Sequence, residues 1–262
     1  MKKIVLVAAM LLTFMGAKAQ TNIQEMYDFG RGHLTTTLEM FKGDNWGSTF
    51  FFVDIYHTNN IAPTDFYTEI ARTINFWGRN TSIGDNFVNN LSLHVEWNGG
   101  NGIYPIKTTD VEGNPLPDAW GGYPVNNAWL AGIEYFIANN DFSQRLTLEV
   151  LYKNIRGTKA GFDKTANVPL QFTAVWGIDN LFGVRGLSFS GFADFWWENN
   201  LWADGTETTT TFLTEPQLWY QVGRHFNCDN LNIGGEIEIA HNFAGADLGW
   251  TVRPCFGIKW GF

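Results

Sequence analysis

Three residues of the types found in hydrolytic triads lie at alternate positions of one stretch: Ser92, His94 and Glu96. Together they could activate a nucleophile if hydroxyl and imidazole came within hydrogen-bonding distance, about 2.6–3.2 Å. In an extended strand, residues two apart are separated by about 6.5–7 Å. A neighbouring strand could complete a triad, but the sequence has no nucleophile elbow or comparable motif. A hydrolase is therefore the less favoured alternative, and we predict no catalytic residue.

The two cysteines, Cys228 and Cys255, show no metal-binding or disulfide pattern in their spacing. We expect both to be free thiols. The sequence predicts neither a bound metal nor a cofactor.

The elements that would position functional residues are strands, seen best in residues 249–262. From Val252 the even positions are apolar or proline and the odd positions polar or small. A period of two over about ten residues, apolar on one face, is what a membrane-spanning barrel strand requires. The final aromatic, Phe262, resembles the signal that the barrel-insertion machinery reads in Gram-negative outer-membrane barrels, so we expect that machinery as a partner.

The same alternation recurs in runs of about ten residues separated by Gly, Asn, Asp and Pro. Twelve runs are predicted: 23–30, 33–42, 47–57, 66–77, 91–98, 128–138, 144–153, 169–178, 186–197, 210–222, 231–242 and 250–262. An even number suits a closed antiparallel barrel with both termini on one side. The predicted fold is therefore all-β, a twelve-stranded antiparallel transmembrane β-barrel formed by residues 20–262. Pro216 and Pro254 fall inside runs and are expected at bulges or rim positions, since proline cannot donate to a ladder.

The links between runs tend to alternate between long and short, as extracellular loops and periplasmic turns do in outer-membrane barrels. Residues 99–127 form the longest link, rich in Gly, Pro and aromatic residues. They could fold inward as a constriction or remain a surface loop.

Residues 1–19 have the features of a secretory signal peptide: Lys2 and Lys3, an apolar run over 4–15, and Ala17-Lys18-Ala19 before the cleavage position. Without them the chain has 14 basic and 26 acidic residues, a net charge of about −12. This balance argues against nucleic acid as a partner. Aromatic residues make 16% of the chain and charged residues only 16%, below the roughly 25% of soluble domains. The expected location is the outer membrane of a Gram-negative cell, with its lipid as a partner.

If the apolar row of each run faces lipid, the alternate row faces a lumen. Arg72 is the exception among the strand charges and is expected near a membrane interface. From the inward row we predict solute-binding candidates: Phe52, Asp54, Glu69, His94, Glu96, Glu149, Phe192, Asp194, Trp196, Glu215, Trp219, Glu236 and Arg253. Carboxylates would accept hydrogen bonds from hydroxyls and the aromatic rings would stack on a flat ring. The same residues could instead form a purely structural charge network that fills a small barrel.

A soluble β-sandwich shares the alternation. The barrel is favoured because aromatic residues fall at run ends, where membrane-interface belts belong. These are Phe76 or Trp77, Trp97, Tyr152, Trp176, Tyr220 and Trp260.

Residues 175–199, VWGIDNLFGVRGLSFSGFADFWWEN, resemble the Tsx-type nucleoside-specific channels of the outer membrane. The matching residues are Trp176, Gly177, Leu181, Gly186, Leu187, Ser188, Gly191, Phe192, Asp194 and Phe195. The resemblance implies a monomeric twelve-stranded barrel that admits nucleosides by facilitated diffusion, with Phe192 and Asp194 in the lumen and, by alternation, Phe195 towards lipid.

The predicted function is a channel for small polar solutes, with nucleosides as the candidates that the resemblance implies. A structural or adhesive barrel with a plugged lumen is the main alternative.

Overall fold

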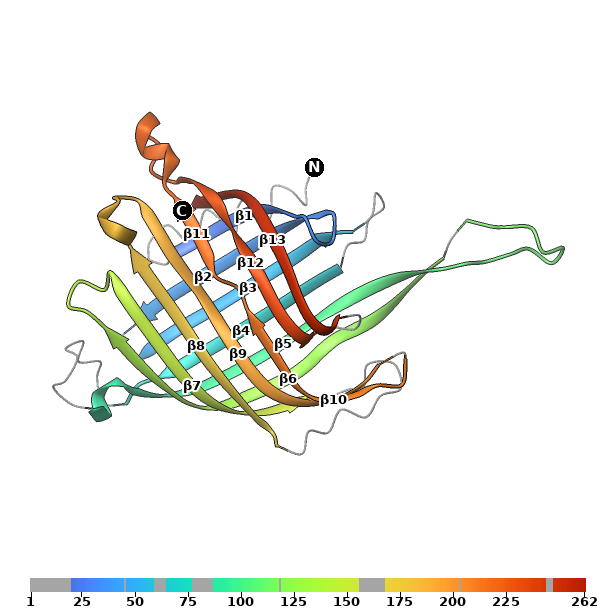
Figure 1. Cartoon of the computed structure of the whole chain (residues 1–262), viewed down its shortest axis with the longest axis horizontal. Coiled ribbons are helices and arrows are strands. Elements are labelled where there is room, and N and C mark those ends of the chain that lie inside the picture. The colour runs from blue at the N-terminus through green and yellow to red at the C-terminus, as the bar shows by residue number, and fades with distance from the viewer. Residues whose placement is uncertain are drawn as a thin grey trace.

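The chain closes into a single β-barrel (Figure 1). The structure, a computed structural model, describes residues 20–44, 46–58, 65–76, 87–117, 119–155, 168–202, 204–243 and 247–262. The predicted signal peptide and Trp77 lie outside these residues. Within the described ranges, no helix is long and apolar enough to cross a membrane.

The described strands and the three short 3-10 helices are, in chain order, β1 (Gln20–Asp28), β2 (His33–Asp44), β3 (Gly47–His57), β4 (Asp65–Ile74), η1 (Phe87–Asn90), β5 (Leu91–Ile106), β6 (Ala119–Ala138), β7 (Gln144–Ile155), β8 (Leu170–Asp179), η2 (Leu181–Gly183), β9 (Leu187–Leu201), β10 (Glu207–Thr214), β11 (Gln217–Tyr220), η3 (Val222–Phe226), β12 (Leu231–Phe243) and β13 (Asp247–Gly261). Each strand pairs antiparallel with its neighbours, and β1 closes the barrel on β13 from Asn22 opposite Gly261 to Asp28 opposite Cys255.

The barrel wall has twelve strand positions, as predicted, and we call each position a stave. Both β10 and β11 lie between β9 and β12, so they are two halves of one stave that is interrupted at Glu215 and Pro216. Pro216 marks this break, because it has no N–H to continue the ladder. Pro254 lies inside β13, where its carbonyl accepts from Phe29 N at 3.1 Å, just past the last β1–β13 pair. A residue in an antiparallel strand directs its backbone N–H and C=O groups towards the same neighbouring strand. The missing N–H of Pro254 therefore faces the rim, as expected.

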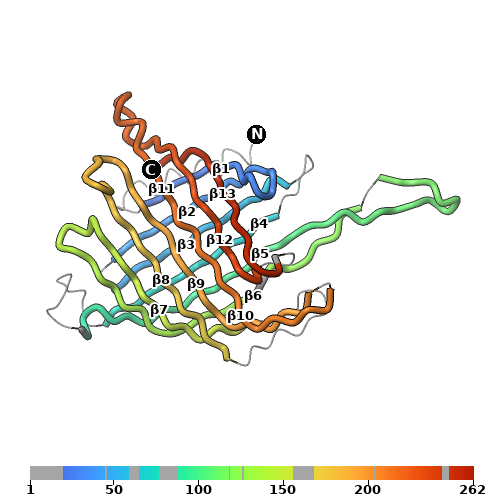
Figure 2. Tube along the Cα trace, in the orientation of Figure 1, coloured from blue at the N-terminus to red at the C-terminus, as the bar shows by residue number. Residues whose placement is uncertain are grey.

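Both ends of the described chain lie at one end of the barrel, where Phe262 N donates to Thr21 O at 2.9 Å. We call this the terminal end, and the other the loop end. The tilted strands and the two ends are visible in Figure 2.

Most of residues 99–127 belong to β5 and β6, and these strand residues do not fold into the lumen. After a bulge at Gly99 and Gly100, β5 and β6 continue to pair as far as Ile106 opposite Ala119, and this hairpin projects well away from the barrel (Figures 1 and 2). Its glycines make room for aromatic rings that lie across the ribbon: a Cβ at Gly102 would be 2.2 Å from the Tyr123 ring. Here glycine leaves room for an aromatic ring from the neighbouring strand, as in the aromatic rescue of strand glycines, and it does not mark a loop. We call residues 101–124 the arm.

The two faces of the wall differ as the alternation predicts. On β13, the side chains of Val252, Phe256 and Ile258 are more than half exposed on the outside. Among the buried residues many are polar, including Gln24, Thr37, His94, Glu134, Glu149 and Lys153. Apolar outside and polar inside is the pattern of a transmembrane barrel and the reverse of a soluble sandwich.

The structure shows where two residues expected on the outer face, Arg72 and Trp176, lie. Arg72 on β4 pairs with Asp44 at 2.7 Å, beside the β2–β3 turn at the terminal end of the wall. Trp176 instead contributes to the lining of the interior cavity. Its indole lies over Gly191, the residue opposite it on β9, where an added Cβ would come within 2.9 Å of the ring.

Candidate functional site

A cavity of about 400 Å³ occupies the barrel interior. All twelve staves contribute to its lining, which reaches from Asp28 and Arg31 at the loop end to Phe41 and Phe136 at the terminal end. The cavity therefore follows the barrel axis along most of its length.

Negative charge dominates the lining. Eleven carboxylates face three cations, Arg31, Arg145 and Lys259, besides His94. The carboxylates are Asp28, Glu39, Asp54, Glu69, Glu96, Glu134, Glu149, Asp194, Glu215, Glu236 and Glu238. A lining with this excess of carboxylates attracts cations and repels anions.

Ten of the thirteen predicted candidates line this cavity. They are Phe52, Asp54, Glu69, His94, Glu96, Glu149, Phe192, Asp194, Glu215 and Glu236. Strand periodicity alone brings them together, because each occupies the inward row of its stave.

Trp196 and Trp219 lie inside the wall but are covered by lysines. The Lys153 ammonium group sits 3.9 Å from the Trp196 ring centroid, and Lys259 sits 4.2 Å from that of Trp219. Both indole N–H groups are also used, donating to Glu198 and Gln217 at 2.9 Å. The prediction that these rings stack on a solute does not fit, because each has a cation on one face and is almost fully buried.

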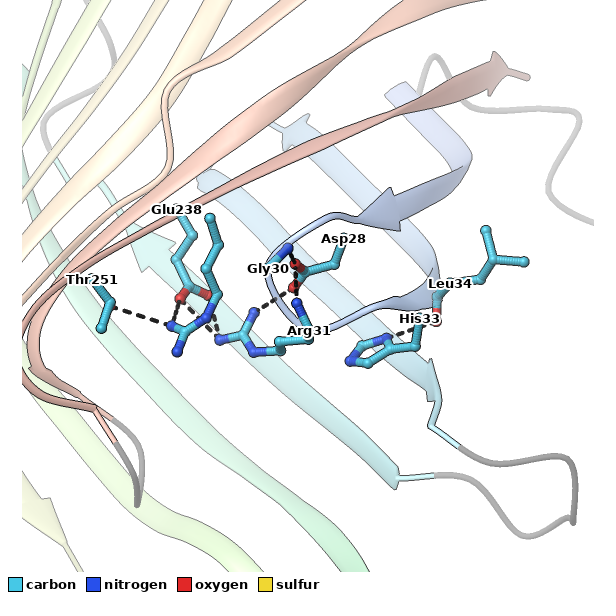
Figure 3. Close-up of polar contacts among 8 residues, drawn as sticks. Asp28, Gly30, Arg31, His33, Leu34, Glu238 and Thr251 are labelled. Atoms are coloured by element: carbon cyan, nitrogen blue, oxygen red, sulfur yellow. Dashed lines mark hydrogen bonds and ion pairs between the residues drawn. The ribbon is translucent and has the colours of Figure 1, made fainter.

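Arg253, the third candidate outside the lining, belongs to a charge cluster at the loop end. Figure 3 shows the cluster around Glu238, Arg31 and Asp28. Glu238 on β12 accepts from Arg253 on β13 at 2.7 Å and from Arg31 at 2.8 and 2.9 Å. Arg31 stands in the β1–β2 turn and also bonds Asp28 at 2.8 Å. The cluster joins that turn to β12 and β13 across the seam where the barrel closes.

Two aromatic residues of β3, Phe50 and Phe52, line the cavity, and Tyr67 packs beside them. Phe50 and Phe52 on β3 have ring centroids 6.0 Å apart, and Phe52 lies 5.9 Å from Tyr67 on β4. Asp54 follows on the same face and accepts from the Thr37 hydroxyl at 2.5 Å. Flat apolar rings beside a carboxylate suit a solute with a planar ring and hydroxyl groups.

The residues of the possible triad are arranged differently from a hydrolase. His94 Nε2 lies 3.0 Å from Glu96, and two further carboxylates, Glu134 and Glu149, lie near Nδ1 at 3.5 and 3.7 Å. The Ser92 hydroxyl accepts from the Asn75 amide at 3.3 Å and does not belong to the described lining of the cavity. Histidine here is surrounded by acids rather than paired with a nucleophile.

Several inward-facing residues of β1 and β9 were not among the predicted candidates. Gln24, Met26 and Asp28 line the cavity from β1. Glu198, which accepts from the Trp196 indole, continues the inward row of β9. Alternation could have found all four. Arg31 could not have been found that way, because it lies in a turn.

Comparison with known protein families shows which family the chain belongs to. The family model described as a domain of unknown function, DUF5020, matches residues 19–262. The chain belongs to the DUF5020 family. A comparison with curated protein sequences finds no match at a significant level for this DUF5020 chain.

Among solved structures, the DUF5020 chain is similar to the crystal structure of the Acinetobacter baumannii outer membrane protein Omp33. The sequence identity is 11% and the TM-score 0.39, over 94% of this chain and 98% of that one. A similarity this distant does not bear on function.

Proposed function

We propose that this protein is an outer-membrane channel for facilitated diffusion of small polar solutes. The observation that carries the proposal is the interior cavity, which is lined from the loop end to the terminal end and by every stave. Twelve strands leave a narrower passage than the 16–18 strands of general porins. The apolar exterior and the signal peptide predicted for residues 1–19 support the outer membrane as its location.

The charge of the lining defines the solutes further. Eleven carboxylates against three cations favour cationic and neutral, hydroxyl-rich solutes over anions. A sugar hydroxyl can donate to these carboxylates, whereas a phosphate group would meet like charge.

Nucleosides are the solute class that we propose within this set. Support comes from the resemblance of residues 175–199 to Tsx-type channels and from the aromatic wall of Phe50, Phe52 and Tyr67. Base stacking on aromatic side chains contributes about 1–3 kcal/mol per base. Phe192 and Asp194, which the resemblance places in the lumen, line the cavity. We further propose that the channel acts as a monomer.

The test is osmotic swelling of liposomes that contain the refolded protein. Uridine and a neutral sugar of similar size should enter faster than into empty liposomes, and uridine monophosphate should enter much more slowly than uridine. Swelling no faster than in empty liposomes, with the barrel folded by heat-modifiable gel mobility, would show a plugged barrel and refute the channel. Equal entry of uridine and its monophosphate would refute the role of the acidic lining.

A further inference from the structure

Three adjacent strands direct four ionisable side chains to one point inside the barrel. His94 and Glu96 lie on β5, Glu134 on β6 and Glu149 on β7. Glu134 and Glu149 are directly opposite each other in the β6–β7 register, and His94 faces Gly132, so no β6 side chain stands directly across from the imidazole. All four side chains border the cavity.

Three carboxylates surround one imidazole in this cluster. Like charges directly opposite each other across two strands are destabilising, and buried charges require partners. The Glu134 and Glu149 side chains are 6% and 7% exposed, and Glu96 stands on the far side of the same imidazole. Even a protonated His94 would supply one positive charge against three carboxylates.

The orientation of His94 adds an independent observation. Nε2 lies 3.0 Å from a Glu96 oxygen, a distance at which an N–H donates to the carboxylate. Nδ1 is buried and, among the described residues, has no hydrogen-bond partner, although oxygens of Glu134 and Glu149 lie 3.5 and 3.7 Å away. If Nε2 carries the proton, a bare nitrogen lone pair points between two carboxylates.

We propose that His94, Glu134 and Glu149 form a binding site for a divalent transition-metal cation, with Zn²⁺ as the best match. Nδ1 and one oxygen from each carboxylate are the ligands, and Glu96 holds the imidazole by accepting from Nε2–H. A carboxylate on the second nitrogen of a ligating histidine is the usual outer-shell arrangement, since it fixes the tautomer and orients the ring. Ligand atoms of His94, Glu96 and Glu149 lie within 4.8 Å of one another, and an oxygen of Glu134 lies 3.5 Å from Nδ1. A bound Zn²⁺ would draw its ligand atoms in to metal–ligand distances of roughly 2.0–2.2 Å.

The types of ligand atom in this cluster favour Zn²⁺ over Ca²⁺ and Mg²⁺. Ca²⁺ and Mg²⁺ are bound by oxygen ligands, whereas an imidazole with carboxylates suits zinc and its first-row neighbours. Three protein ligands leave a position open towards the cavity, where water or a solute group could bind. The site does not depend on whether the barrel conducts.

The test is isothermal titration of ZnCl₂ into the chelator-treated, refolded barrel in detergent. We expect one Zn²⁺ per barrel, and much weaker binding of MgCl₂ and CaCl₂. Glu96→Gln should weaken Zn²⁺ binding about 10–100-fold, as outer-shell substitutions do. His94→Gln and Glu149→Gln should weaken it more, because each removes a ligand.

The matched control is the Glu215→Gln, Glu236→Gln double variant, which removes two lumen carboxylates that have no histidine between them and should leave Zn²⁺ affinity unchanged. Absence of Zn²⁺ binding to the wild-type barrel would overturn the proposal and leave a proton as the occupant of the cluster. Equal weakening by the control and by Glu149→Gln would also overturn it, since a diffuse acidic lumen would then hold the ion.

Heat-modifiable mobility confirms folding, and Glu96→Gln keeps the test decisive if a ligand variant does not fold. Because the titration needs no transport, its failure is distinct from failure of the channel.

Discussion

At the scale of single residues, charge and ring placement define what the lumen can admit. Glu215 and Glu236 stand on neighbouring staves, with Gln217 donating to Glu236 at 2.9 Å. Both residues line the cavity, as does Phe52 on β3. The first two predictions concern these side chains.

Removal of lumen carboxylates should reduce the preference for cations. We expect the Glu215→Gln, Glu236→Gln double variant to conduct, but with a reversal potential closer to zero in a KCl gradient, because two negative charges leave the passage. Asp110→Asn, in the exposed tip of the arm, is the matched control and should leave the reversal potential unchanged. An unchanged value in the double variant would mean that ions bypass these carboxylates.

Phe52→Ala should weaken nucleoside block of the conductance. The loss of one stacking ring corresponds to about 1–3 kcal/mol, or about 5–150-fold in affinity. Phe66→Ala, on the outer face of β4, serves as the control because its ring is exposed to the lipid side. If both variants retain full block, the aromatic wall does not bind the solute.

Alternation identified Phe52, Asp54 and most of the lining from sequence because a strand places every second residue on one face. It could not show that Trp196 and Trp219 are covered by Lys153 and Lys259. That contact depends on which strands are neighbours and on their stagger, and neither is specified by the pattern within one run. The convergence of Glu134 and Glu149 on His94 was missed for the same reason, since three strands must be registered to reveal it.

At the scale of elements, the β1–β2 turn joins the two ends of the sheet. Arg31 in this turn and Arg253 on β13 share Glu238 of β12. We expect Arg253→Ala to lower the free energy of unfolding by about 1–3 kcal/mol, because it removes a hydrogen bond to a buried carboxylate. Arg31→Ala should cost at least as much, because it removes hydrogen bonds to two buried carboxylates, Asp28 and Glu238. Urea unfolding in detergent, followed by tryptophan fluorescence, measures both. A clearly smaller loss for Arg31→Ala would contradict this order.

The arm provides the second element-scale prediction. Deleting residues 103–122 and joining Gly102 to Tyr123 through an Asn-Gly turn should preserve folding and leave conductance unchanged, because the arm projects away from the lumen. Planar-bilayer recording checks this. A constriction loop would instead give a larger conductance on deletion, and that result would contradict the arrangement of β5 and β6.

The sequence predicted the number of staves but not the length of these elements. Glycine and proline in residues 99–127 were interpreted as loop signals, yet Gly102 and Gly121 lie against the rings of Tyr123 and Tyr104. Local composition cannot distinguish a glycine that ends a strand from one that accommodates a cross-strand ring. Pro216 was interpreted correctly, since the absence of an N–H has the same consequence in any strand.

At the scale of the whole molecule, closure turns an apolar–polar alternation into an acidic passage inside an apolar cylinder. The β1–β13 and β12–β13 ladders complete this closure. Twelve staves and a 400 Å³ cavity are compatible with one small solute at a time. The chain belongs to the DUF5020 family and forms a closed barrel, and we propose transport through the lumen of that barrel.

Single-channel recording of the refolded protein in a planar bilayer, under a KCl gradient and with uridine titrated in, tests this transport directly. We expect discrete openings, a reversal potential of the sign for cation selectivity, and openings reduced by uridine. A folded, inserted barrel without openings would contradict passage through the lumen, and an anion-selective conductance would contradict the role assigned to its carboxylates.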